Sequence, residues 1–196
     1  MNFTQGLQSA RLHLRPLCLD DADALFSMMS DPRVMRYWNT PPWTEPEQAV
    51  HGILRDMEAF ARGEYLTLAI TRRHESGLIG TCTLFDIAEA SRRAELGYCL
   101  ASAAQGQGLM NEALRSLLDY AFGDLRLNRL EADIDPRNLA SAATLERLGF
   151  RHEGLLRQRW MVAGEVSDSA LYGLLAEDWA QGRQVPPVPG ERAPGS

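Results

Sequence analysis

The stretch Gln105-Gly106-Gln107-Gly108-Leu109-Met110-Asn111-Glu112-Ala113-Leu114 joins a glycine-rich turn to the start of an amphipathic helix. The segment before it, residues 94–100, has the pattern of a β-strand. Gly106 and Gly108 allow backbone angles that other residues resist. The first N–H groups of a helix are unpaired and carry partial positive charge, so they bind an anion without a basic side chain. Strand, turn and helix in this order predict a site for a phosphate-bearing ligand.

The contacts to such a ligand are expected from the turn itself. Gln105 and Gln107 can add side-chain hydrogen bonds, and Asn111 can cap the helix or touch the ligand. The pattern is not a dinucleotide-binding GxGxxG, because Asn111 stands at the third glycine position, and no GK[ST] follows to make a Walker loop. The candidate ligand contacts are Gln105, Gly106, Gln107, Gly108, Leu109, Met110 and Asn111.

A second pair of segments narrows the interpretation. Asp135-Pro136-Arg137-Asn138-Leu139-Ala140-Ser141 leads into Leu145-Glu146-Arg147-Leu148-Gly149-Phe150. Together with the glycine turn, these segments resemble the GNAT superfamily of acyl-CoA-dependent N-acetyltransferases, and most of all its RimJ/RimL-type branch. The resemblance runs from about Leu12 to Trp179. Met110 departs from it, because the family commonly has a small residue there.

The resemblance implies a fold, a cosubstrate and a reaction. The fold would be a mixed α/β sheet in which strands 92–100 and 129–134 splay apart, with the acyl thioester between them. The cosubstrate would be acetyl-CoA, contacted by Leu96, Gly97 and Tyr98 on the first of these strands. The reaction would be direct transfer of the acetyl group to a primary amine in a ternary complex.

Composition sets the broad class. The chain has 196 residues, 45% hydrophobic and 23% charged, which suits one globular domain. No apolar run reaches the ~20 residues that span a bilayer, and the first residues lack a secretory signal, so we expect a cytoplasmic protein without a membrane partner. Three scattered cysteines and four scattered histidines show no metal spacing. A net charge of −6 argues against nucleic acid and slightly favours an amine substrate.

Hydrophobic periodicity and turn residues predict the remaining elements. Hairpin-spaced strands indicate antiparallel pairing, and the order of elements indicates helices on both faces of a mixed sheet. Residues 1–184 are expected to form the domain, and the Pro- and Gly-rich residues 185–196 a disordered tail. The predicted strands are 11–15, 65–71, 78–87, 92–100, 129–134, 153–162 and 165–175, and the predicted helices are 21–30, 44–62, 107–122 and 138–148.

Two residues are candidates for proton transfer. Glu95, early on the splayed strand, is the candidate base for the incoming amine; the alternative is a surface carboxylate paired with an arginine at 92 or 93. Many GNAT enzymes have a tyrosine general acid where this chain has Leu145. Ser141, one helical turn earlier, is the candidate replacement, and a water molecule is the alternative. Asn138 is expected to cap its helix and to contact the cofactor.

The acceptor pocket is the least defined part of the site. Trp38, in an aromatic loop, and Asp168 and Tyr172, on the last strand, are candidate acceptor contacts, although each could instead serve packing or lie on the surface. A free α-amino group has pKa ~7.7–8.0 against ~10.4 for lysine, a difference of ~3.5 kcal/mol in deprotonation work. One modest carboxylate therefore fits a protein or peptide N-terminus best. A small-molecule amine acceptor or a noncatalytic acyl-CoA-binding module are the alternatives, and the chain could be a monomer or a homodimer.

Overall fold

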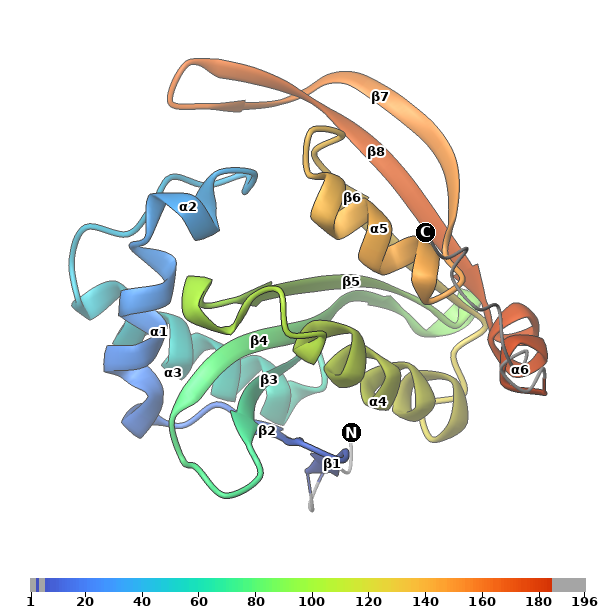
Figure 1. Ribbon diagram of the computed structural model, residues 1–196, viewed down its shortest axis with the longest axis horizontal. Helices are drawn as coiled ribbons and strands as arrows, with labels where there is room; N and C mark the ends of the chain where they lie inside the picture. The colour runs from blue at the N-terminus through green and yellow to red at the C-terminus, as the bar shows by residue number, and fades with distance from the viewer. Residues whose placement is uncertain (1–2, 4–5, 185–196) are drawn as a thin grey trace, which may run out of the picture.

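One sheet organises the molecule (Figure 1). The computed structural model describes residue 3 and residues 6–184, and within this part of the chain the strand order is β1-β2-β3-β4-β5-β6-β8-β7. The strands are β1 (Leu7–Gln8), β2 (Leu12–Pro16), β3 (Leu66–Arg72), β4 (Leu78–Ala88), β5 (Arg93–Leu100), β6 (Arg129–Ile134), β7 (Arg151–Val162) and β8 (Glu165–Leu175). The helices are α1 (Ala22–Met29), α2 (Pro32–Met35), α3 (Glu47–Arg62), α4 (Leu109–Gly123), α5 (Leu139–Arg147) and α6 (Ala176–Gln184), with 3-10 turns at Leu19–Asp21, Glu89–Ser91 and Ser102–Ala104.

The sheet is mixed, as predicted, and its single parallel pair lies at the centre. Every neighbouring pair is antiparallel except β5 and β6, which α4 connects. These two strands pair at only three positions, Arg93 with Arg129, Ala94 with Leu130 and Glu95 with Glu131. Beyond Glu95 they separate, so the predicted splay between strands 92–100 and 129–134 is confirmed.

Helices cover both faces, also as predicted. Side chains alternate along a strand, so Leu66, Leu68 and Ile70 of β3 point into the larger core cluster, which α4 and α5 share. Ala69 points into the second cluster, formed with α1 and α3. The same alternation divides the two faces of β5, on which the site depends.

Local signals explain where several helices begin and end. The backbone N–H groups of Thr44 and Glu45 donate to the side-chain oxygen of Gln48 at 2.8 and 2.9 Å, which satisfies the free donors before α3. Gly63 ends α3 with φ of 73°, and Gly149 follows α5 with φ of 92°. Both are left-handed positions that favour glycine, which is why the sequence marks these helix ends.

The sequence did not predict three of the described elements, which are β1, α2 and α6. The first two are only two and four residues long, too short for a periodic pattern. α6 is fixed by a distant contact, because the indole N–H of Trp179 donates to Asp119 of α4 at 2.9 Å. The predicted tail, residues 185–196, lies outside the described residues. Of the helices that are described, none has the length and apolar character needed to cross a membrane.

Candidate active site

The glycine turn places an open helix start beside β5. Gly106 and Gly108 have φ of 73° and 72°. Both adopt the left-handed conformation that favours glycine, as the sequence predicted. Gly108 is the N-cap of α4 and, lacking a side chain, makes no side-chain cap. A Cβ at Gly106 would meet nothing within 4 Å, so the space in front of the turn is open. The turn therefore offers an anion backbone N–H groups and the positive end of the α4 dipole.

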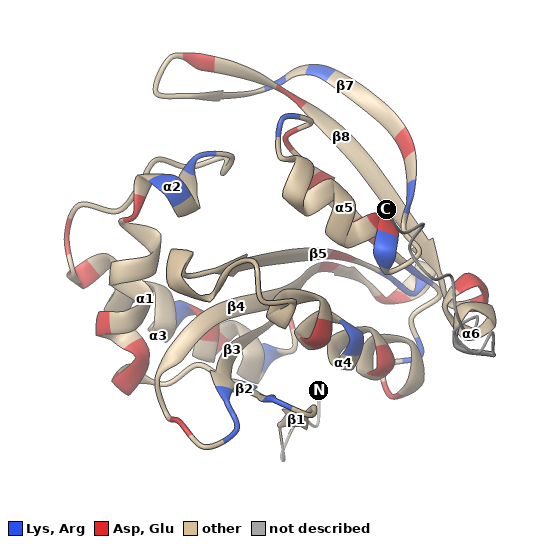
Figure 2. Ribbon diagram, in the orientation of Figure 1, with Lys and Arg blue, Asp and Glu red and all other residues tan. Residues whose placement is uncertain are grey.

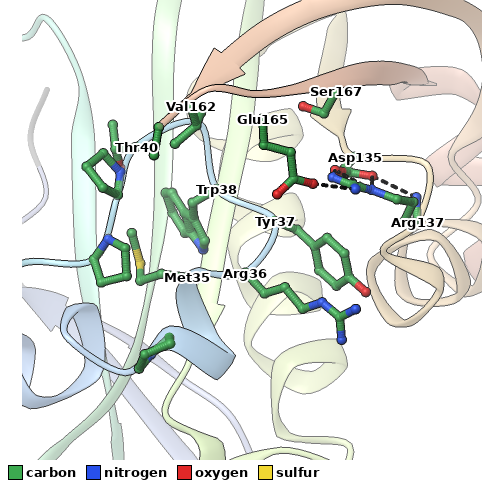
Figure 3. A pocket seen from close by; sticks show the side chains of 14 residues that line it. Met35, Arg36, Tyr37, Trp38, Thr40, Asp135, Arg137, Val162, Glu165 and Ser167 are labelled. Carbon is green, nitrogen blue, oxygen red and sulfur yellow. Dashed lines mark hydrogen bonds and ion pairs between the residues drawn. The ribbon is translucent and has the colours of Figure 1, made fainter.

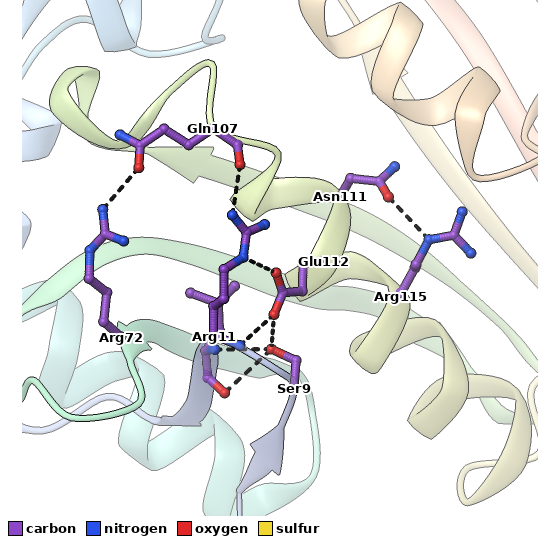
Figure 4. Close-up of polar contacts among 8 residues, drawn as sticks. Ser9, Arg11, Arg72, Gln107, Asn111, Glu112 and Arg115 are labelled. Carbon is purple, nitrogen blue, oxygen red and sulfur yellow. Dashed lines mark hydrogen bonds and ion pairs between the residues drawn. The ribbon is translucent and has the colours of Figure 1, made fainter. Parts of the chain in front are cut away.

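The polar side chains of the turn are largely occupied within the protein. Gln105 donates to the carbonyl of Leu100 at 3.0 Å, and the Gln107 side-chain oxygen accepts from Arg72 at 3.0 Å (Figure 4). Asn111 accepts from an arginine one turn further along α4, while its amide nitrogen is buried without a hydrogen-bond partner. The side chains of Leu109 and Met110 pack into the core. Most of these side chains are therefore engaged within the protein, and a ligand at this segment would meet mainly its backbone.

Glu112 joins the first turn of α4 to the N-terminal residues Ser9 and Arg11 (Figure 4). Its carboxylate accepts from the Ser9 hydroxyl at 2.7 Å, from the Arg11 backbone N–H at 2.7 Å and from the Arg11 side chain at 2.6 Å. Arg11 also donates to the Gln107 carbonyl at 3.1 Å. This network holds the β1–β2 hairpin against the first turn of α4, so Glu112 has a structural role here.

A cavity of about 290 Å³ lies where β5 and β6 diverge. Its walls come from β4, β5, β6, the first turn of α5, the β7–β8 hairpin and the loop after α2. It brings together the predicted residues Trp38, Glu95, Leu96, Gly97, Tyr98, Asn138, Ser141 and Asp168, and adds Tyr37, Asn39, Phe85, Asp86, Asp133, Ile134, Asp135, Arg159, Trp160 and Ser167.

Glu95 is a half-buried carboxylate in this cavity, with 23% of its side chain exposed. Burial raises its pKa above the usual value, and the negative charge of Asp86 on β4 and that of Glu131 raise it further, against the attraction of Arg93. Arg93 is 3.9 Å from Glu95 but hydrogen-bonds Glu131 instead. Glu95 thus lies near an arginine, as a surface ion pair would require, and also has the raised pKa expected of a base. Because Arg93 hydrogen-bonds Glu131, the Glu95 carboxylate remains available to accept a proton.

Tyr98 and Ser141 form a hydroxyl pair on the other side of β5. The Tyr98 and Ser141 oxygens are 2.6 Å apart, and burial raises the pKa of Tyr98 to about 12. Asn138 caps α5 by accepting the Ser141 backbone N–H at 3.1 Å, which sets the position of the hydroxyl. Leu145, at the position of the family tyrosine, is fully buried. The tyrosine hydroxyl beside Ser141 therefore comes from Tyr98 on β5, a residue that the sequence analysis predicted only as a cofactor contact.

The three predicted acceptor contacts have different surroundings. Trp38 and Asp168 line the cavity, and Asp168 also accepts the Gln158 backbone N–H at 2.7 Å, which holds a bulge in β7. Tyr172 is 6% exposed in the larger core cluster, with its ring edge-on to His152 at 5.3 Å. Tyr172 is not among the residues that line the cavity, so its placement supports packing rather than acceptor contact.

Two charged residues of the cavity, Asp86 and Arg159, were not among the predicted site residues, and each has a partial signal in the sequence. Asp86 sits at a bulge in β4 with φ of 48°, a conformation that Asp tolerates better than most residues. Arg159, on β7, forms an ion pair with Asp133 of β6 at 2.9 Å across the cavity wall. Sequence alone could flag Arg159 and Asp133 as charges on strands but not as partners.

A second cavity, of about 300 Å³, adjoins the first and shares Tyr37, Trp38, Asp135 and Ser167 with it. Figure 3 shows Arg137 between Asp135 and Glu165, to both of which it forms ion pairs. Figure 2 shows the arginines of α2 and of the loop entering α5 around this region. The ion pair between Arg137 and Glu165 links the loop before α5 to the tip of the β7–β8 hairpin and so fixes one rim of the site.

Among the described residues, no group of three or more His, Cys, Asp or Glu side chains is placed to hold a metal ion.

Comparison with known proteins identifies the family. A sequence model of the acetyltransferase (GNAT) domain matches residues 11–151. The chain is 37% identical over 176 residues to the uncharacterized N-acetyltransferase p20 of Bacillus licheniformis, covering 90% of this chain and 99% of that protein. It is 34% identical over 110 residues to the [ribosomal protein uS5]-alanine N-acetyltransferase of Escherichia coli, covering 56% and 57%.

Solved structures of other acetyltransferases have a similar fold. The crystal structure of the microcin C7 self immunity acetyltransferase MccE, in complex with acetyl-CoA and AMP, superposes with a TM-score of 0.78 at 23% identity, covering 88% of this chain and 97% of that one. At this identity the likeness concerns the fold alone. Together with the domain match and the full-length relative, it confirms the predicted fold class. The chain therefore belongs to the GNAT acetyltransferases, the family that transfers acetyl groups from acetyl-CoA to amines.

Proposed function

We propose that the acetyl acceptor is the N-terminal α-amino group of a protein or peptide. The observation that carries this proposal is Glu95, a half-buried carboxylate with a raised pKa at the wall of the cavity. A base of this kind suits an amine with pKa near ~8, of which roughly a tenth is neutral at pH 7, better than lysine. The partial match to a ribosomal protein alanine N-acetyltransferase supports the same class of acceptor.

The glycine turn fits the phosphate end of acetyl-CoA. A Cβ at Gly106 would meet nothing within 4 Å, and the helix start has no side chain of its own to cap it. Leu96, Gly97 and Tyr98 line the cavity beyond it, where the splayed strands leave room for the thioester arm. When bound, acetyl-CoA supplies the acetyl group as a thioester.

The two proton-handling groups lie on opposite faces of β5. Glu95 alternates with Ala94 and Leu96, which face the α4 side, so its carboxylate faces the α3 side; Tyr98 faces α5. Glu95 accepts a proton from the acceptor ammonium, and the neutral amine forms the C–N bond as the C–S bond breaks. The Tyr98–Ser141 pair donates a proton to the departing thiolate, and the second proton that the amine nitrogen loses as the amide forms restores this pair. No covalent bond to the protein is needed.

The charge of the cavity supports a cationic acceptor. Its carboxylates outnumber its arginines, since Arg159 is the single arginine in the wall. The acidic members are Asp86, Glu95, Asp133, Asp135 and Asp168. The same observation favours a second candidate, a small cationic amine, which the experiment below separates from a peptide.

The test is acetylation of an amine panel by the purified protein, measured by thiol release and by mass spectrometry of the acceptor. The panel contains peptides with free N-termini, the same peptides blocked at the N-terminus with an internal lysine, polyamines and amino sugars. All 20 basic residues of the enzyme are arginine, so side-chain lysine acetylation of the enzyme adds no background. Turnover confined to free N-termini supports the proposal. Turnover confined to polyamines or amino sugars contradicts it, and tight acetyl-CoA binding without turnover of any amine points to a binding module.

A further inference from the structure

A third cavity, of about 280 Å³, lies between α1, α3 and the strands β3 and β4. Two residues, Trp38 and Phe85, line both this cavity and the cavity at the splayed strands. This third cavity is lined by none of the residues predicted to contact the acetyl donor. Its other lining residues are Leu17, Leu25, Met29, Trp43, Gly52, Arg55, Asp56, Tyr65, Thr67, Thr81 and Thr83.

This cavity lies on the same face of the sheet as Glu95. Phe85 of β4 is the direct cross-strand partner of Glu95, and Thr83 is the partner of Gly97. Directly opposed residues share a face, so Glu95, Phe85 and Thr83 point to the α3 side. An amine held at Glu95 is therefore next to Phe85, and a group attached to that amine can reach the third cavity past Phe85 and Trp38.

The lack of a side chain at Gly97 leaves room for the Phe85 ring in the shared lining of the two cavities. A Cβ added at Gly97 would be 3.3 Å from the Phe85 ring, a distance at which the ring would have to move. Gly97 is predicted to contact the cofactor on the basis of family resemblance, and its position below Phe85 gives it a second use. The absence of a side chain here leaves the Phe85 ring in place where it lines both cavities.

Gly52 keeps the third cavity open on the helix side. It is a buried glycine inside the sixteen-residue α3, where glycine costs helix stability relative to alanine. A Cβ at Gly52 would meet the Trp43 ring at 3.4 Å, ordinary van der Waals contact, so alanine would fit there. Packing in the unliganded protein therefore does not require glycine, and a longer side chain would enter the cavity.

Several polar groups of the cavity wall are satisfied by each other. The hydroxyls of Thr83 and Thr67 are hydrogen-bonded at 3.2 Å, and the Tyr65 hydroxyl donates to Asp56 at 2.8 Å. An occupant does not need to supply partners for these pairs. The rest of the wall is mainly aliphatic and aromatic, and sites of this kind bind apolar groups, with sizes from ~300 Å³ upward for whole ligands. At about 280 Å³ the cavity has room for a large apolar side chain.

We propose that this third cavity is a specificity pocket that takes an apolar side chain, aliphatic or aromatic, from the first residue of the acceptor. This inference rests on the proposed N-terminal acceptor and names its class: peptides that begin with a large apolar residue. Trp38 and Phe85 form the passage between the pocket and the reacting amine, and Gly52 sets the depth of the pocket. Burial of the side chain positions the amine at Glu95.

The experiment compares peptides that differ only in the first residue, beginning with Gly, Asp, Leu or Phe, by steady-state kinetics. The native enzyme is expected to have kcat/KM at least tenfold higher for Leu or Phe than for Gly or Asp. Gly52→Leu is expected to remove this preference by filling the pocket, while the Gly peptide and the acetyl-CoA Kd measured by calorimetry change less than twofold. Gly52→Ala, which fits beside Trp43, gives a smaller loss and covers the case in which the leucine variant fails to fold.

Gly182→Leu is the matched control, because Gly182 lies on α6 with nothing within 4 Å of an added Cβ. It should retain the native preference. Equal kcat/KM for all four peptides in the native enzyme, or the same loss on Gly and Phe peptides in both Gly52 variants, overturns the pocket assignment while leaving N-terminal acetylation intact. Failure of every peptide, with turnover of small amines, removes the proposed function itself and with it the pocket assignment.

Discussion

Replacement of Glu95 by glutamine tests the reasoning about the reaction most directly. The change keeps the size of the side chain and its place opposite Phe85, but removes the group that accepts the proton. General-base catalysis contributes ~10²–10⁴-fold in enzymes. With 23% of the Glu95 side chain exposed, water can take over part of this role, so we expect the lower end, a loss of about 100-fold in kcat/KM. At 1.36 kcal/mol for each factor of ten, this is about 2.7 kcal/mol.

The pH profile gives a second and independent readout of the same change. Glu95 must be ionised to accept a proton, so activity falls as pH decreases through its pKa. Burial and the charge of Asp86 raise that pKa, which places the acidic limb of the native profile above the ordinary glutamate value of 4.5. Glu95→Gln should lose this limb. Asp86→Asn should keep the limb and move it to lower pH, because it removes a negative charge that favours the protonated form.

The assay is thiol release from acetyl-CoA with a peptide acceptor, between pH 5 and pH 9, with acetyl-CoA binding measured in parallel. Glu89→Gln serves as the control, since it is the same substitution at an exposed carboxylate in the turn between β4 and β5. It should match the native enzyme throughout. A Glu95→Gln enzyme that keeps native kcat/KM across this range, with its acidic limb unchanged, refutes the assignment of Glu95 as base.

Three further predictions concern other parts of the site. Tyr98→Phe and Ser141→Ala should each lower kcat about tenfold or more with little change in acetyl-CoA Kd, and the double variant should lose little more than either single one, because the two hydroxyls act as one hydrogen-bonded unit. Gly106→Ala should weaken acetyl-CoA binding in calorimetry, since a left-handed non-glycine residue costs about 1–2 kcal/mol; Gly77→Ala, at an open position with no positive φ, should bind normally. Glu112→Gln should lower the free energy of unfolding by about 1–2 kcal/mol in urea titrations at pH 7, because charged hydrogen bonds are lost.

The pH dependence of the last effect has a definite sign. Burial opposes ionisation of Glu112, but the hydrogen bonds from Ser9 and Arg11 outweigh it, and the pKa of Glu112 is lowered in the folded protein. Its contribution to stability is therefore complete above the ordinary pKa of 4.5 and is lost as pH falls through the lower folded value. The difference in unfolding free energy between native protein and Glu112→Gln should shrink below about pH 4.5. A difference that stays constant from pH 7 to pH 3 contradicts this account.

The sequence by itself determined the local parts of this protein. Left-handed glycines at 106, 108, 63 and 149 could be assigned because a helix end or a tight turn is decided by a few neighbouring residues. The strands from β3 to β8 followed from period-two patterns and turn residues, and the family resemblance supplied the splay between β5 and β6. These features depend on interactions over a few positions along the chain, which a sequence displays directly.

Only the tertiary structure decided which side chains meet. Tyr98 and Ser141 are 43 positions apart, and their contact depends on how α5 packs against β5. The structure also buried Tyr172 in the core and brought Asp86 near Glu95 through a bulge in β4. The third cavity exists because α3 packs against β3 and α1 against β4, with Gly52 of α3 in its wall. Register, strand divergence and helix packing set these distances through contacts across the whole sheet, and no local pattern encodes them.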